Sequence, residues 1–68
     1  MANKYCFKAA RILAGMTQED AAKRIGVQQS TLSHWERERS EPSIAAVVKM
    51  SIVYNVPIDY LAGLSPYI

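Results

Sequence analysis

The stretch TQEDAAKRIGVQQSTLSHWE, residues 17–36, contains two short helical patterns joined by the tripeptide IGV, which leaves no room for a loop. Thr17 begins the first pattern with a hydroxyl suited to capping a helix, and Asp20 is a shortened version of the capping-box acid. Gly26 stands where the chain must turn sharply, and glycine takes a positive φ without steric penalty. The spacing therefore predicts two helices joined by a tight turn, the layout of a helix-turn-helix over about residues 17–37.

The second helix of this pair is expected to begin at about Gln28 and to have two unlike faces. Leu32 and Trp35 fall on one face at a spacing of three, so we expect Trp35 in the core rather than stacked on a base. The other face carries amides, hydroxyls and an imidazole: Gln28, Gln29, Ser30, Ser33 and His34. Amides and hydroxyls can donate to and accept from base edges in a major groove, so this face predicts DNA reading.

The whole chain of 68 residues has room for one small domain over residues 1–68, and a large active-site cleft is not expected. Half of its residues are hydrophobic and 21% are charged, which favours a folded unit over a disordered tail. The net charge of +2 is too small to identify a nucleic-acid binder by itself. No apolar run approaches a membrane span, and the N-terminus does not resemble a signal peptide. Together with the single Cys6, these features predict a cytoplasmic protein.

Three further helices are expected around the helix-turn-helix. Apolar spacing predicts a first helix over 4–14. Ile12 and Leu13 make its apolar surface wider than one buried stripe requires, so we expect one of them to be partly exposed. A polar loop over 37–42 precedes a helix over 44–54, which Ser43 caps and Asn55 ends. Pro57 begins a short helix over 58–62. The pattern is all-α with five helices.

Four parts of the sequence match a known family in register: Arg11, GMTQEDAAKRIGV at 15–27, STLSHWERERSEPS at 30–43 and VVKMSIVYNVPIDYLAG at 47–63. Over about residues 7–63 the chain resembles the XRE-like family of phage repressor and Cro proteins. The resemblance implies a five-helix, lambda-repressor-like DNA-binding domain. It also implies a homodimer that binds operator DNA and acts as a transcriptional regulator, repressor-like, in a bacterium, a phage or a mobile element.

The resemblance assigns roles to individual residues. Gln29, Ser30 and His34 occupy the family's usual base-reading positions, with Gln28 at the edge of the set; for His34, a DNA contact and a plain exposed side chain both remain open. Residues expected to hold DNA phosphate lie on either side of this helix: Thr17, Gln18, Arg37, Arg39 and Ser40.

Two further positions bear on stability and on the DNA backbone. Arg11 and Glu36 resemble the family's buried ion pair, the alternative being two unrelated surface charges. Glu38 replaces a usual glycine, so either the helix runs on or a residue with a Cβ takes a left-handed conformation at about 1 kcal/mol. An acidic residue there also lies near the expected phosphate contacts.

The C-terminal segment 60–68 is more apolar than a monomer of this size comfortably exposes. We therefore expect it to contribute a dimer interface through Tyr60, Leu64, Tyr67 and Ile68.

Two rival functions remain. An antitoxin that represses its own operon would belong to the same class, and a protein-interaction module would keep the fold without binding DNA. An enzyme is least expected, because His34 is the only histidine and the sequence has no nucleophile–base pair and no metal-ligand spacing. We expect no metal, no cofactor and no small-molecule ligand. The sequence does not specify the operator, the regulated genes or the host.

Overall fold

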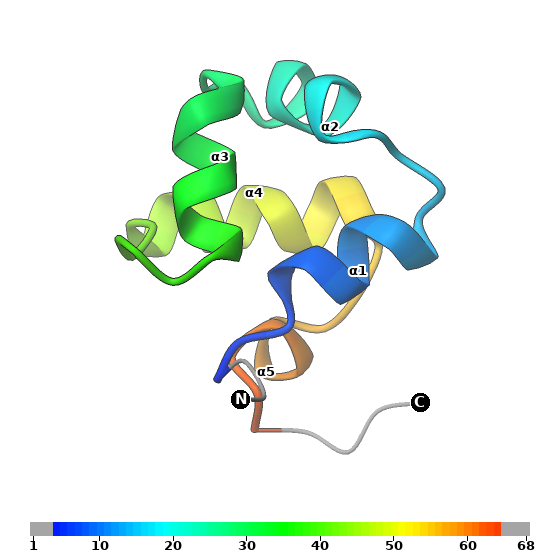
Figure 1. Ribbon diagram of the computed structural model, residues 1–68. Coiled ribbons are helices and arrows are strands. Elements are labelled where there is room, and N and C mark those ends of the chain that lie inside the picture. Colours follow the sequence, from blue (N-terminus) through cyan, green and yellow to red (C-terminus); the bar gives the residue numbers. More distant parts are fainter. Residues whose placement is uncertain (1–3, 65–68) are drawn as a thin grey trace.

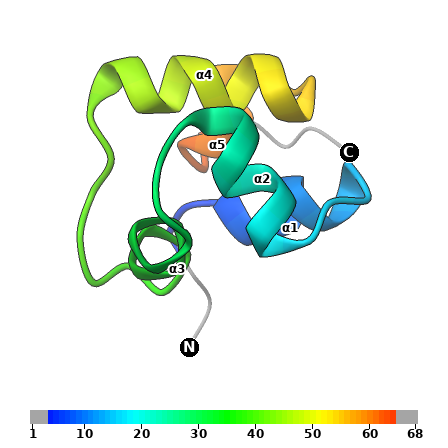
Figure 2. The same cartoon turned by 90° about the horizontal axis from the view of Figure 1, so that it is seen from above.

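The computed structural model describes residues 4–64, and within them it contains five helices and no strand. In chain order the helices are α1 (Phe7–Leu13), α2 (Gln18–Ile25), α3 (Gln29–Glu36), α4 (Ile44–Tyr54) and α5 (Ile58–Leu61). Figure 1 shows α3 and α1 in front of α4, with α2 above them and α5 below. The view from above in Figure 2 shows α4 along the face of the molecule opposite α3. The predicted all-α, five-helix fold is confirmed.

Local signals set several helix ends as predicted. The Thr17 hydroxyl accepts a hydrogen bond from the Asp20 N–H at 3.1 Å, and the Ser43 hydroxyl accepts one from the Ala46 N–H at 3.1 Å. Each bond satisfies one of the N–H groups that the first turn of a helix leaves without a partner. At the other ends, Gly26 (φ 90°) closes α2 and Asn55 (φ 57°) closes α4 in left-handed conformations.

The first helix is shorter than predicted, because α1 begins at Phe7 rather than at residue 4. The preceding residues pair with distant parts of the chain instead of with the helix. The Cys6 N–H donates to the Leu61 carbonyl at 3.0 Å, which joins this segment to α5. The last helix also ends one residue early, with Ala62 as its C-terminal cap.

The core draws on all five helices. Leu32, Met50 and Leu61 are its largest fully buried side chains, and burying each from water contributes about 2–3 kcal/mol. Trp35 is buried, as predicted. Among residues 4–64, the buried apolar side chains of the core are Phe7, Ala10, Ala21, Ala22, Ile25, Leu32, Trp35, Met50, Tyr54, Tyr60 and Leu61.

Some large apolar side chains lie outside this core. On α1, both Ile12 and Leu13 are exposed, where the sequence pattern led us to expect only one. On α4, Ile44 and Ile52 are 84% and 73% exposed, whereas Met50 and Tyr54 are buried and form the inner face of that helix.

Candidate nucleic-acid interface

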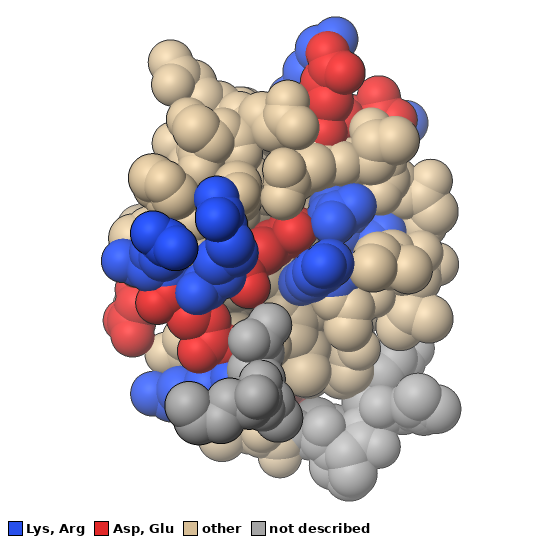
Figure 3. Space-filling view, in the orientation of Figure 1, with Lys and Arg blue, Asp and Glu red and all other residues tan. Residues whose placement is uncertain are grey.

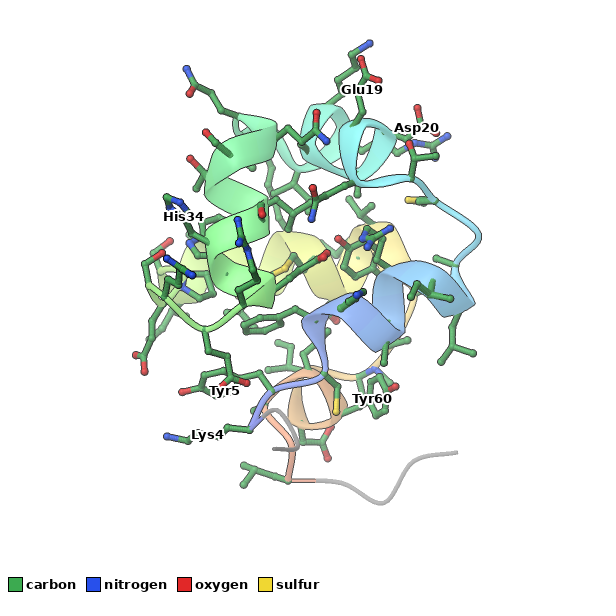
Figure 4. All side chains as sticks on the ribbon, in the orientation of Figure 1. Lys4, Tyr5, Glu19, Asp20, His34 and Tyr60 are labelled. Carbon is green, nitrogen blue, oxygen red and sulfur yellow. The ribbon has the colours of Figure 1, made fainter. Side chains whose placement is uncertain are left out.

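The polar face of α3 forms one wall of an open hollow. Six side chains line it, and all six are among the predicted DNA-contacting residues: Gln18, Gln29, Ser30, Ser33, His34 and Arg37. The first comes from the N-terminal turn of α2 and the others from α3 or its C-terminal cap. Figure 4 shows His34 projecting from the outer side of α3, away from the body of the fold. Gln28 caps α3, is exposed and lies outside this hollow.

Two glutamine side chains within the hollow are connected to each other and to the core. Gln29 Nε2 donates to Gln18 Oε1 at 3.4 Å, and Gln18 Nε2 donates to Glu36 Oε1 at 3.1 Å. A glutamine amide has two N–H donors and one carbonyl acceptor. Gln29 therefore retains one N–H and its Oε1, which together match the N7 acceptor and the N6 donor of adenine.

Beneath these amides, Arg11 and Glu36 form a two-pronged ion pair. Arg11 Nε donates to Glu36 Oε2 at 2.7 Å and Nη2 donates to Glu36 Oε1 at 3.1 Å, while Nη1 donates to the Met16 carbonyl at 3.0 Å. The side chains are 11% and 3% exposed, so the pair links α1 to the end of α3 within the protein interior. The hydrogen bond to Glu36 raises the pKa of Arg11 above its usual value, which keeps the guanidinium charged.

Tyr54, the last residue of α4, lies close to this ion pair. Burial, reinforced by the nearby Glu36 carboxylate, raises the pKa of Tyr54 to about 12. Its hydroxyl is buried and has no hydrogen-bond partner within residues 4–64. The phenol therefore stays neutral and contributes to the core mainly through its ring.

Of the predicted phosphate-contacting residues, Gln18 and Arg37 line the hollow, whereas Thr17, Arg39 and Ser40 do not. Thr17 and Gln18 are at the N-terminus of α2, where backbone N–H groups and the helix dipole favour an anion. Arg37, Arg39 and Ser40 are exposed beyond α3, and Arg37 Nη2 donates to the Ser33 hydroxyl at 3.2 Å. This last bond holds a cation next to the polar face of α3.

A further cation, Lys8, was not among the predicted site residues. It lines a second hollow with Arg11, Gln18, Ser33, Glu36 and Arg37. Figure 3 shows basic side chains on both sides of acidic side chains near the middle of this face of the molecule. The signal for Lys8 was its spacing of three from Arg11 on α1, which places both residues on one helix face.

The structure distinguishes the two possibilities left open for Glu38. Helix α3 ends at Glu36, and Glu38 takes a left-handed conformation with φ 59°. Its carboxylate Oε2 accepts a hydrogen bond from the Tyr5 N–H at 3.0 Å. The acidic group is thus engaged by the N-terminal segment, an arrangement that the local sequence did not indicate.

The predicted dimer residues do not form one exposed group. Tyr60 is only 8% exposed, so its inclusion in the interface needs correction: its ring packs into the core beside Leu61. Leu64 is 80% exposed. Tyr67 and Ile68 lie outside the described residues.

Within residues 4–64, no group of His, Cys, Asp and Glu side chains is placed to hold a metal ion. Within the same range, every helix is too short or too polar to cross a membrane.

Known proteins match most of this chain, and a matching family model covers the region that contains the five helices. A family model described as "Helix-turn-helix" matches residues 7–61. The chain is 41% identical over 56 residues to the HTH-type transcriptional regulator ImmR of Bacillus subtilis. The matched segment covers 82% of this chain and 44% of ImmR. The chain thus spans less than half the length of ImmR.

Archaeal relatives are closer to it in length. The chain is 36% identical over 59 residues to an uncharacterised HTH-type transcriptional regulator of Methanocaldococcus jannaschii, covering 87% of this chain and 86% of the relative. It is 38% identical over 47 residues to an uncharacterised HTH-type transcriptional regulator of Archaeoglobus fulgidus, covering 69% of this chain and 67% of the relative.

Proposed function

The chain belongs to the XRE-like helix-turn-helix family of DNA-binding transcriptional regulators, and from this premise we propose that it binds operator DNA with α3 in the major groove. The observation that carries the proposal is the convergence of polar side chains from α2 and α3 on one open hollow. Bound in this way near a promoter, the domain acts as a repressor by occupying the site.

In the proposed complex, Gln29 makes the main base contact, since its free N–H and Oε1 can pair with one adenine edge. Ser30, Ser33 and His34 reach the neighbouring base pairs from the same face of α3. Gln28 lies outside the hollow, so its contribution is at the margin of the site.

Phosphate contacts hold α3 in its groove. Thr17 and Gln18 present the N-terminus of α2 to one strand, while Arg37, Arg39 and Ser40 approach the backbone from the other end of α3. Lys8 adds a cation from α1. These contacts fix the register of the domain but carry no direct sequence information.

One domain of this size offers few contacts, so we propose that two copies bind half-sites about one helical turn, roughly 34 Å, apart. The exposed Leu64 supports a dimer interface at the C-terminal end, with Tyr67 and Ile68 as further candidates. The solution dimer can be weak, because DNA raises the effective concentration of one copy near the other. We place this activity in the cytoplasm, where the DNA is accessible.

The test begins with selection of bound sequences from random DNA, followed by titrations on the selected site and on random DNA. Gln29→Ala should cost about 1–3 kcal/mol on the selected site and much less on random DNA. Gln28→Ala is the matched control, and we expect a smaller loss because that side chain lies outside the hollow. Arg39→Ala should weaken binding to both DNAs alike and flatten the salt dependence by about one unit.

Equal losses for Gln29→Ala on both DNAs would rule out Gln29 as a base reader. Absence of salt-dependent DNA binding by the unaltered chain would instead favour a protein-interaction module with this fold.

A further inference from the structure

The segment before α1 is held between two distant parts of the fold. On one side, the Cys6 N–H donates to the Leu61 carbonyl of α5 at 3.0 Å. The carbonyl oxygen of Lys4 lies so close to Gly63 that a Cβ at that position would clash with it. The Tyr5 ring stacks on Phe7, with ring centroids 5.1 Å apart and planes 21° apart. These contacts with α5, Gly63 and Phe7 therefore hold Tyr5 in place.

On the other side, Tyr5 makes two contacts with the loop between α3 and α4. Its backbone N–H donates to Glu38 Oε2 at 3.0 Å, and its hydroxyl donates to Glu41 Oε2 at 3.2 Å. Figure 4 shows Tyr5 near the C-terminal end of α3, where this loop begins. We call this pair of contacts the Tyr5 clamp.

The clamp holds the part of the loop that carries the cations. Glu38 lies between Arg37 and Arg39 and turns the chain through a left-handed conformation. A glycine would adopt φ 59° with less strain, but it has no carboxylate to bind Tyr5. Glu38, the residue between the two arginines, thus has a strained backbone but supplies the carboxylate that binds Tyr5.

We propose that Tyr5 and Glu38 are positioning residues, which hold residues 37–40 in the conformation that meets DNA phosphate. The clamp also joins the Glu38 carboxylate to the N-terminal segment through its hydrogen bond with the Tyr5 N–H. This role rests on the proposed DNA-binding function, and it concerns phosphate contacts rather than base reading.

Two substitutions at Glu38 separate the hydrogen bond from the charge. Glu38→Gln removes the charge but keeps an acceptor at the same reach. Glu38→Asn removes the same charge and tolerates the left-handed conformation, but its amide is one methylene too short. Tyr5→Phe removes only the contact with Glu41 and keeps the ring stacked on Phe7.

The probe is a short duplex of mixed sequence, because phosphate contacts do not depend on the bases. Each variant is titrated at several salt concentrations, well below the melting temperature of the least stable variant. We expect Glu38→Gln to bind at least as tightly as the unaltered chain. Glu38→Asn should bind about three- to tenfold more weakly than Glu38→Gln, the factor associated with one hydrogen bond, with a flatter salt dependence. Tyr5→Phe should likewise lower the affinity for DNA, here measured against the unaltered chain.

A purely structural clamp would lower the melting temperature and leave the affinity and salt dependence of the folded protein unchanged. Equal affinities and slopes for Glu38→Gln and Glu38→Asn would therefore overturn the positioning role while leaving the proposed function intact. No binding by the unaltered chain would overturn both. Hydrogen exchange at the Tyr5 amide tests the contact without DNA: exchange as fast as in an unfolded peptide would overturn the clamp itself.

Discussion

Separating Arg11 from Glu36 tests whether the fold depends on the ion pair beneath the proposed DNA-reading face. Glu36→Gln leaves a guanidinium, in a side chain only 11% exposed, without a counter-charge, and Arg11→Met leaves a carboxylate in a side chain only 3% exposed. Breaking a buried pair on one side costs about 3–5 kcal/mol. Two charges about 4 Å apart attract by about 4 kcal/mol at the effective dielectric of a protein, and this sets the scale of the coupling.

The assay is urea denaturation of the unaltered chain, the two single variants and the double variant. A chain this short has a total stability of about 3–10 kcal/mol, so a stabilising osmolyte in all four samples keeps the single variants measurable. We expect a coupling energy of about 2–4 kcal/mol, with the double variant more stable than the sum of the single losses implies. A coupling below about 0.5 kcal/mol, the range of an exposed pair, would refute the reasoning.

Two further predictions concern the core and the C-terminus. Tyr54→Phe removes a buried hydroxyl that has no hydrogen-bond partner within residues 4–64, so stability near pH 7 should stay within about 1 kcal/mol of the unaltered chain or rise. Between the ordinary pKa of 10.0 and the folded value of about 12, the folded chain retains the Tyr54 proton and the unfolded chain loses it. The unaltered chain should therefore lose about 2–3 kcal/mol relative to Tyr54→Phe as pH rises through that range, and parallel stability curves would contradict this. Deleting residues 64–68 should leave the fold largely intact and lower the affinity and cooperativity of operator binding; sedimentation and DNA titration showing no change would exclude this interface.

Local chemistry made much of the fold predictable. Thr17, Ser43 and Asn55 act on the backbone within a few residues of themselves, so sequence spacing was enough to place the helix ends near them. The polar face of α3 was predictable for the same reason, because helical periodicity alone determines which side chains share a face.

Features that depend on distant contacts were not predictable in this way. The late start of α1 depends on bonds from Tyr5 and Cys6 to residues more than thirty positions away in the sequence. Helix α4 is apolar on more than one face, so its sequence did not show that Met50 rather than Ile52 would point inward. The burial of Tyr60 was not predictable either, because it depends on how α5 packs against the rest of the fold.

The most direct test of the central claim is to map, by NMR, which backbone amides shift when the selected operator is added to the folded chain. We predict that the largest changes fall on the N-terminal turn of α2, on residues 28–34 and on residues 37–40, while the outer face of α4 at Ile44 and Ile52 stays unchanged. Shifts concentrated on that face of α4, with residues 28–34 unaffected, would contradict the claim that α3 reads the DNA.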